Sequence, residues 1–443
     1  MSFPQYLNYK PSPIECAPSV PAHWAISKLK RVMEFRTGWT PPTGRDDYYR
    51  GPNPWVTIGD MRSKYLEVTE KQISDEAARV ARMSPVPKGS LLFSFKLSIG
   101  QVSFAGCELY TNEAIASFSP DGSLNLGYCY YAFPIFVSAN AAENIYGAKL
   151  LNQQLIGDAT ILIPSISEQQ EIARFLDNET GKIDELIAEQ ERLIELLKEK
   201  RQAVISQAVT KGLNPDAPMK PSGVEWIGDI PGHWRMIPLK RNIEFVTSGS
   251  RGWAGNYSDD GDVFIRIGNL TRDSIRLDLS DIQRVFVEDG AEGSRTRVRS
   301  GDVLFSITAY LGSVAVISDL NENAYVSQHV ALTRLKQEHL VPKWVGFVAL
   351  SVIGKTWFEM QSYGGTKIQL SLDDISNFPV PVPSVLEQRV IVDWIERELA
   401  RYDALTIEAN GAISLLKERR SALIAAAVTG QIDVRGFAEQ SAA

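Results

Sequence analysis

Cysteine, histidine and long apolar runs are all scarce in this chain of 443 residues. Its three cysteines (Cys16, Cys107 and Cys129) are odd in number and never form a Cys-x-x-Cys pair, which argues against a disulfide framework and a zinc site. Four scattered histidines are too few for a metal cluster. No apolar stretch reaches the roughly 18 residues of a membrane span, and the first residues lack the pattern of a secretory signal. We therefore expect a cytoplasmic protein.

An excess of basic residues is also missing. Lys and Arg number 46 against 53 Asp and Glu, which gives a formal net charge of −7. A protein that binds DNA alone usually has a clear positive excess, because Lys and Arg displace counterions from the phosphates. Either this chain does not bind DNA, or partner subunits supply much of the contact with phosphate.

Catalytic motifs are absent too. The chain has no GxxxxGK[ST] phosphate loop. It has no Asn/Asp-Pro-Pro-aromatic tetrapeptide of the amino-methyltransferases, since the TPPT at Thr40 lacks both the required first residue and the aromatic. The nearest nuclease-like fragment, Pro215-Asp216, is not followed by an acidic-x-Lys sequence. The sequence thus predicts no catalytic site and no cofactor of its own.

What the chain does contain is an internal repeat, which is the feature to seek first. Three segments return about 210 to 220 residues later: VPAHWAISKLKRVMEF (from Val20) as IPGHWRMIPLKRNIEF (from Ile230), KGSLLFSFKLSIGQV (from Lys88) as SGDVLFSITAYLGSV (from Ser300), and PSISEQQEIARFL (from Pro164) as PSVLEQRVIVDWI (from Pro383). The repeat covers roughly 12–213 and 222–434. A unit of this length is a duplicated domain pair rather than a solenoid repeat.

Each repeat has two parts. The first part mixes short β-type runs with Gly and Pro turn signals, which predicts a compact α+β domain. The repeated His-Trp pairs, His23-Trp24 and His233-Trp234, are expected to anchor the chain rather than bind a ligand. The second part opens with Ser165 or Ser384, followed three residues later by Glu168 or Glu387, a capping-box pattern that starts a helix.

The helix after each capping box should be long. Its apolar positions alternate at spacings of three and four residues, a heptad seam, in both copies: Leu176, Ile183, Ile187, Ile194, Leu197, Val204 and Ala208, then Ile395, Tyr402, Thr406, Ile413, Leu416, Leu423 and Ala427. Two such helices in one chain most simply pack on each other. The expected division is a first domain at 1–164, a central helix at 165–213, a linker and second domain at 214–382, a distal helix at 383–434 and a tail at 435–443.

Candidate DNA contacts lie in the loop after the first helical segment of each domain. The loops combine glycine, aromatic residues and arginine, which suit phosphate, base-edge and stacking contacts: Arg36, Trp39, Arg45, Tyr48, Tyr49 and Arg50 in one copy, and Arg251, Trp253 and Tyr257 in the other. The alternative is an ordinary solvated loop.

Further basic candidates lie outside these loops. Lys149 and Lys367 follow glycines just before the last strand-like segment, where the backbone could approach phosphate closely, and Lys96 lies on LLFSFKLSIG. Tyr310, one residue past its aligned position, is a weaker candidate. Arg295, Arg297 and Arg299 alternate, so a strand would place all three on one face. This stripe indicates either a specificity difference between the domains or an exposed edge.

The whole pattern resembles the specificity subunits of type I restriction-modification systems. The similar residues are the strand ends, the Glu-Gln pairs and the helix ends of both copies: Ile163, Pro164, Glu168, Gln169, Lys198, Lys200, Arg201, Ala208, Val209 and Thr210, with Val382, Pro383, Glu387, Gln388, Lys417, Arg419, Arg420, Ala427, Val428 and Thr429. The LLFSFKLSIG and VLFSITAYLG segments are similar to the family's LFS…IG pair. The resemblance covers nearly the whole chain, although YGAKLLNQQL is less regular than YGGTKIQLSL.

This resemblance implies a non-catalytic subunit with two target recognition domains related by a pseudo-twofold repeat, each reading half of a split double-stranded DNA sequence. It implies that the long helices form an antiparallel coiled coil that fixes the gap between the halves. It also implies two modification subunits that use S-adenosylmethionine to methylate adenine, and restriction subunits (motor-nucleases) that use ATP and Mg. Such partners would supply the missing basic surface. The rival interpretations are a coiled-coil scaffold that does not read DNA, and a methyltransferase or nuclease in its own right, which the missing motifs oppose.

Overall fold

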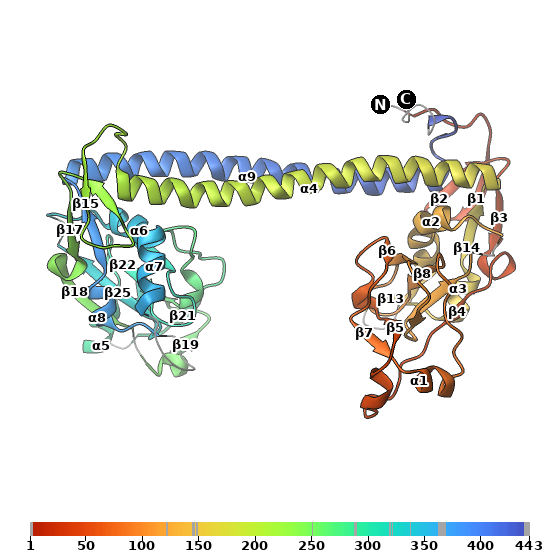
Figure 1. Cartoon of the computed structure of the whole chain (residues 1–443), viewed down its shortest axis with the longest axis horizontal. Coiled ribbons are helices and arrows are strands. Elements are labelled where there is room, and N and C mark those ends of the chain that lie inside the picture. Colours follow the sequence, from red (N-terminus) through yellow and green to blue (C-terminus); the bar gives the residue numbers. More distant parts are fainter. Residues whose placement is uncertain are drawn as a thin grey trace. The chain divides into compact units, whose positions relative to one another are not determined.

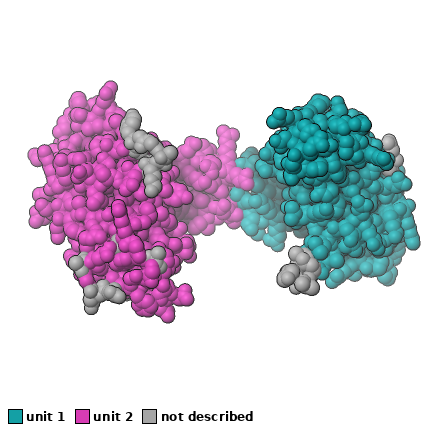
Figure 2. All heavy atoms as spheres, turned by 90° about the horizontal axis from the view of Figure 1, so that it is seen from below, with its two compact units in different colours: residues 1–189, 412–443 teal, residues 190–411 magenta. Residues whose placement is uncertain are grey.

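The structure is a computed structural model that describes residues 3–120, 123–143, 147, 149–249, 251–287, 290–318, 320, 322–336, 338–361 and 369–437. The chain forms two compact units (Figure 2). Unit 1 comprises Met1–Glu189 and Ala412–Ala443, and unit 2 comprises Gln190–Gly411. Each unit therefore takes its residues from both halves of the repeat.

Unit 1 is built on a five-stranded sheet with a buried centre. Its strands follow the order β4 (Arg36–Thr37), β11 (Ile115–Phe118), β8 (Leu91–Ser94), β9 (Val102–Ala105) and β6 (Tyr65–Leu66). A second sheet has the order β10 (Tyr110–Thr111), β5 (Asn53–Val56) and β7 (Lys71–Ile73). Three two-stranded pairs complete the strands: β1 (Tyr9–Ile14) with β2 (Ala17–Pro21), β3 (Ala25–Lys28) with β14 (Thr160–Ile163), and β12 (Ala142–Glu143) with β13 (Lys149–Leu150).

Three short helices belong to the globular part of unit 1: α1 (Asp75–Val80), α2 (Leu126–Ala139) and α3 (Gln153–Asp158). Helix α2 covers the main sheet through aromatic side chains, since the Phe133 ring lies 4.9 Å from that of Phe118 and 6.5 Å from that of Phe93. All three rings are buried, so they form the centre of the unit's core.

Unit 2 has two four-stranded sheets. One follows the order β18 (Ile243–Ser248), β25 (Val330–Leu335), β22 (Val303–Ser306) and β23 (Val314–Val316); the other is β19 (Tyr257–Ser258), β21 (Gln283–Val285), β20 (Asp262–Ile265) and β24 (Ala324–Val326). The two-stranded pairs are β15 (Met219–Pro221) with β16 (Asp229–Pro231), and β17 (Arg235–Pro238) with β26 (Pro379–Val382). The short helices are α5 (Ala291–Thr296), α6 (Pro342–Leu350), α7 (Val352–Gln361) and α8 (Leu372–Ser376).

The two units repeat the same strand pairings. Strand β8 lies between β11 and β9 in unit 1, as β22 lies between β25 and β23 in unit 2, and all four pairings are antiparallel. The first covering helix is held alike in both, because Tyr128 donates to the Leu162 carbonyl at 3.0 Å and Trp344 to the Pro381 carbonyl at 2.8 Å. The predicted repeat of two α+β domains is thus present in the structure.

Two long helices carry the heptad seam. Helix α4 spans Ile166–Lys211 and α9 spans Val385–Val428, so α9 ends before the predicted limit at 434 (Figure 1). Every predicted seam position on both helices is buried or half-buried. Within unit 1 the start of α4 and the end of α9 are joined by an ion pair between Asp184 Oδ1 and Arg420 Nε at 2.8 Å. Within unit 2 an Arg201–Asp403 ion pair joins the end of α4 to the first half of α9.

The start of each long helix departs from the predicted capping box. The serine half is present, since Ser165 Oγ accepts from the Glu168 amide at 3.4 Å and Ser384 Oγ from that of Glu387 at 3.2 Å. The reciprocal half is wrong, because neither carboxylate returns to the serine amide. Glu168 accepts instead from Trp24 Nε1 at 3.0 Å, and Glu387 from Trp234 Nε1 at 3.0 Å. Both indoles are fully buried, and a buried N–H donor must find an acceptor.

The same tryptophans also pack against the glycines that follow the long helices. Gly212 follows α4 at φ +70°, and a Cβ there would lie 3.2 Å from the Trp234 ring. Gly430 follows α9 at φ +72°, where a Cβ would meet Pro21 at 2.3 Å and the Trp24 ring at 3.1 Å. Each tryptophan is therefore packed between the start of one long helix and the end of the other, which confirms its predicted role as an anchor.

Membrane-spanning helices and metal-binding clusters were sought among the described residues. None of their helices is both long and apolar enough to cross a membrane. No group of three or more His, Cys, Asp and Glu side chains among them could hold a metal ion.

Candidate nucleic-acid interface

The hairpin between β8 and β9 carries Lys96 of unit 1. The Lys96 side chain is half-exposed, and its Nζ lies 4.0 Å from Glu113 Oε1. Partial burial alone would raise the pKa of Glu113, but hydrogen bonds from the Thr40 hydroxyl and its own backbone amide, together with the Lys96 charge, hold that pKa below its usual value. Glu113 therefore stays ionised and keeps Lys96 beside the aromatic loop that contains Thr40.

That loop begins at β4, where Arg36 is exposed on an edge strand. Trp39 is half-buried: its ring packs against that of Tyr48 at 6.5 Å, and its carbonyl accepts from Trp55 Nε1 at 3.0 Å. The loop is thus fixed by Trp39 rather than free in solvent, which leaves only part of the indole for a stacking contact. Tyr48 is buried, and Tyr49 donates to the Pro41 carbonyl at 2.6 Å.

Arg45 lies further along the same loop and is exposed. Its guanidinium forms a two-point pair with Asp47, at 2.9 and 2.7 Å, and lies 4.3 Å from the Tyr48 ring centroid. The hydrogen bonds from Arg45 lower the pKa of Asp47. Arg50, also exposed, lines a shallow pocket with Tyr49 and Lys71. Among the loop's arginines, Arg36 and Arg50 are exposed to solvent, whereas Arg45 would exchange Asp47 for a phosphate.

The matching loop of unit 2 is anchored in the same manner. The Trp253 ring stacks on Phe264 with centroids 5.7 Å apart and an interplanar angle of 29°, and it also contacts Tyr325. Arg251 is exposed before Gly252, whose φ of +82° turns the chain. Tyr257 keeps 46% of its surface exposed. The sequence thus correctly paired the two loops, and the structure shows that a tryptophan in each serves packing.

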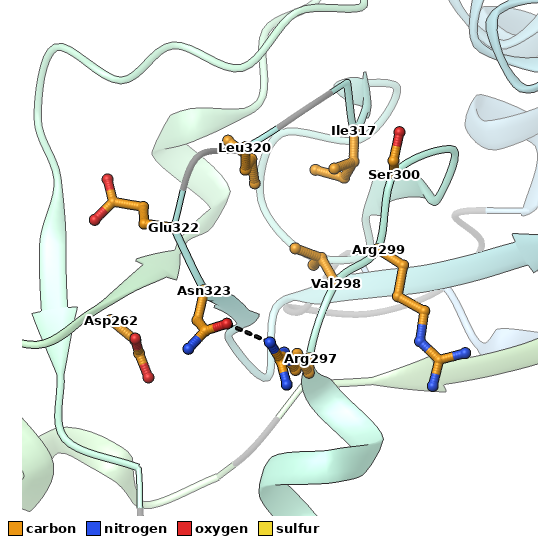
Figure 3. Close-up of a pocket in the computed structure, with 9 residues that line it drawn as sticks. All are labelled: Asp262, Arg297, Val298, Arg299, Ser300, Ile317, Leu320, Glu322 and Asn323. Carbon is orange, nitrogen blue, oxygen red and sulfur yellow. Dashed lines mark hydrogen bonds between the residues drawn. The ribbon is translucent and has the colours of Figure 1, made fainter.

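The predicted arginine stripe in unit 2 is wrong. Arg295 lies in α5, Arg297 follows that helix, and Arg299 lies in the turn before β22, so no strand aligns them. Arg295 Nη1 donates to the Ser248 carbonyl at 2.6 Å, while Arg297 turns toward Asn323 (Figure 3). Arg297 and Arg299 line a pocket of about 490 Å³ that also holds Asp262 and Glu322. Residues 291–296 form a helical turn, Arg297 then forms an isolated antiparallel bridge with Tyr325 of β24, and the Arg299 amide donates to Asp302 at 2.7 Å.

Sequence reasoning missed the counterpart of Arg295 in unit 1. Helices α1 and α5 occupy matching places in the order of elements, and each carries a Glu–Arg pair three residues apart: Glu76 with Arg79 at 2.7 Å, and Glu292 with Arg295 at 3.9 Å. Arg79 is exposed. The segments between these helices and the following strands differ in length, which hid the match. The signal that could have found it is the shared Glu-x-x-Arg spacing.

Of the two lysines predicted to contact DNA after a glycine, Lys149 and Lys367, the structure describes only the first. Lys149 lies on β13, exposed and paired across the ladder with Glu143, after Gly147 at φ +76°. Lys367 lies outside the described residues. Tyr310 is 58% exposed at the tip of the β22–β23 hairpin, and the Arg272 guanidinium lies 5.8 Å from its ring centroid.

Comparison with known proteins decides what this duplicated arrangement is. The sequence model of the type I restriction modification DNA specificity domain matches the chain twice, over residues 21–196 and 244–413. The chain belongs to the type I restriction-modification specificity subunits.

Individual members of the family agree in sequence. The specificity subunit of the type I restriction enzyme EcoBI from Escherichia coli is 27% identical over 323 residues, which cover 71% of this chain and 67% of that subunit. The EcoDI specificity subunit, also from Escherichia coli, is 22% identical over 438 residues, covering 96% of this chain and 92% of the relative.

Solved structures agree in fold. A chain from a structure of a type I R-M system, described as showing complex assembly and conformational transition, superposes with a TM-score of 0.69 at 14% identity, covering 92% of this chain and 98% of its own. The HsdS subunit from Thermoanaerobacter tengcongensis gives a TM-score of 0.51 at 15% identity, with 93% and 98% covered. As a specificity subunit, the chain recognises DNA sequence and is not an enzyme; catalysis lies in other subunits.

Proposed function

We propose that each unit of this specificity subunit reads one half of a bipartite DNA target. The observation that carries the proposal is that the DNA specificity domain occurs twice, each time covering an α+β part and the start of the long helix that follows it. Two readers with matching frameworks but different loop side chains, such as Trp39 with Arg45 against Arg251 with Trp253, suit two different half-sites.

We further propose that the long helices set the spacer between the half-sites and dock two modification subunits. The seam on α4 and α9 supports an antiparallel coiled coil, since positions four and three residues apart are buried or half-buried while most of the charged residues between them are exposed. Glu168 and Glu387 anchor the starts of both helices on buried tryptophans. Through these anchors the length of the helices would fix the distance between the two recognition domains.

The cofactors of the complex would then belong to its other subunits. Methylation would use S-adenosylmethionine held by the modification subunits, and restriction would use ATP and Mg held by the restriction subunits. Partner surfaces would also offset the net charge of −7 by contributing basic residues. Three free cysteines support a reducing, cytoplasmic location.

The experiment is methylation of a randomised DNA library. The chain would be purified with and without the methyltransferase encoded beside it, and methylated molecules would be sequenced. The complex should methylate a motif with two specified halves and an unspecified spacer of fixed length, and the chain alone should methylate nothing. A single uninterrupted motif would overturn the two-reader proposal, and a complex that binds the methyltransferase but selects no motif would favour the scaffold interpretation.

A further inference from the structure

Strained backbone recurs at one place in each unit. In the described chain three non-glycine residues have positive φ, and two of them are at equivalent hairpin tips: Leu97 at +59° between β8 and β9, and Ala309 at +52° between β22 and β23. Both tips end with a glycine in the left-handed region, Gly100 at +92° and Gly312 at +86°. Residues with a Cβ rarely adopt this conformation, and such strain gathers at functional sites.

Each tip is closed by a buried serine at its base. Ser94 Oγ accepts from the Gln101 amide at 3.0 Å and donates to the Ser98 carbonyl, while the Ser94 carbonyl accepts from Gly100 N at 2.9 Å. In unit 2, Ser306 Oγ donates to the Thr308 carbonyl at 3.0 Å. These bonds hold the tips in a fixed shape, so their side chains are presented in a set direction.

The side chains at the tips are large, exposed and different. Leu97 is 97% exposed although it is a leucine, and it follows Lys96. In unit 2 the position of Leu97 holds Ala309, and the exposed large side chain is the next residue, Tyr310, at 58%. Leu97 lies on a tip whose shape the serine bonds and the two residues of positive φ hold in place, so its exposed side chain is presented to a partner.

We propose that these hairpin tips enter the DNA groove, and that Leu97 and Tyr310 read base edges in the first and second half-sites. The inference rests on the proposed function. A two-stranded β-ribbon fits the major groove, where an apolar side chain can recognise the thymine methyl group and a hydroxyl can recognise a polar edge. Lys96 would meet the phosphates beside the groove.

The difference between the tips favours DNA over a protein partner. Two copies of one partner protein bound to equivalent tips would need equivalent side chains, whereas two half-sites of different sequence need different ones. The backbone is the shared feature, and Leu97 and Tyr310 are the variable ones.

The test compares Leu97→Ala with Leu7→Ala in the reconstituted methyltransferase complex, using site selection from randomised DNA. Leu7 is the matched control because it is 98% exposed in the same unit but lies far from the hairpin in sequence. L97A should lower the preference at one base pair of the first half-site by about 5- to 10-fold, the lower end of the range expected for losing one base contact. The second half-site, the salt dependence of binding and the thermal unfolding should stay unchanged.

Two further variants complete the design. Tyr310→Phe should relax one position of the second half-site only, and Lys96→Ala should weaken binding to all sequences alike while reducing the salt slope by about one. Identical motifs for L97A, L7A and the wild type would overturn the inference, as would loss of the methyltransferase from the L97A complex. A wild-type complex without a bipartite motif would instead refute the proposed function, so the two failures are distinguishable.

Discussion

At the scale of single residues, the buried glutamate at the start of each long helix fixes the helix to its unit. Glu168 accepts from Tyr6 Oη at 2.7 Å as well as from Trp24, with His23 Nε2 at 3.1 Å. Burial, and then the hydrogen bond to Glu168, raise the pKa of Tyr6, so its hydroxyl remains a donor. The carboxylate thus accepts from two buried donors, Tyr6 and Trp24, and lies beside the half-exposed His23.

Glu168→Ala should destabilise unit 1 by about 2 kcal/mol, because leaving buried donors unsatisfied costs about 1–3 kcal/mol. Glu387→Ala is the matched variant in unit 2 and should cost less, since Glu387 is 30% exposed and water can replace it. Hydrogen exchange of peptides from each unit, followed in rising denaturant, would measure both losses, because the fluorescence of nine tryptophans cannot be assigned to one unit. Equal losses for the two variants would contradict the burial argument.

Arg251 offers a second prediction at this scale. Arg251→Ala should weaken binding evenly across sequences and lower the salt slope by about one, as expected for a lost phosphate contact. The first half-site preference should remain intact. Arg36→Ala is the matched variant in unit 1, where an exposed arginine opens the equivalent loop. Titrations at several salt concentrations would show a fault in the two-reader proposal if either variant altered both half-site preferences.

At the scale of elements, the glycines that follow the long helices differ from the glycines inside them. Gly430→Ala should destabilise unit 1 by about 1–3 kcal/mol, because a Cβ would meet Pro21 at 2.3 Å in a left-handed conformation. Gly411→Ala lies within α9 with nothing within 4 Å of its Cβ, and should stabilise the helix by about 0.5–1 kcal/mol. Chemical denaturation would separate the two, and a neutral G430A would refute the packing described for Trp24.

The sequence predicts elements well where one physical rule dominates. The heptad seam and the repeated His-Trp and Glu-Gln pairs located the long helices and their anchors, because hydrophobic spacing survives duplication. The alternating arginines Arg295, Arg297 and Arg299 did not form a strand. Alternation predicts a strand only where apolar residues alternate with polar ones, and this segment lacks that pattern. The partner of the Glu168 carboxylate was also unpredictable, because Trp24 lies 144 residues earlier in the chain.

At the scale of the whole molecule, the proposed spacing role of the helices can be tested by lengthening both. Four residues inserted near Leu193 and four near Ala412 add about 6 Å of helix, which should lengthen the preferred spacer by about one or two base pairs at about 3.4 Å each. Such an insertion is a stutter that locally unwinds a supercoil, so some stability should be lost.

Seven-residue insertions provide the contrasting variant. They keep the heptad seam but add about 10.5 Å, or about three base pairs. About ten base pairs make one turn of duplex, so one reader would be rotated by roughly a quarter turn or more relative to its groove. This variant should fold well and bind poorly. Site selection from randomised DNA would measure both, and an unchanged spacer in the active four-residue variant would show that the helices do not set the distance.

The division of the chain between the units has a consequence for synthesis on the ribosome. The core of unit 1 includes Ala427, Val428 and Val434, all fully buried, although the rest of that core lies before residue 190. Unit 2 draws only on Gln190–Gly411. The core of unit 1 therefore cannot be completed until more than 200 further residues have been synthesised, which takes on the order of tens of seconds. The core of unit 2 can be completed as soon as its part of α9 has left the ribosome. The part made first is completed last, and until then Trp24 lacks one side of its packing.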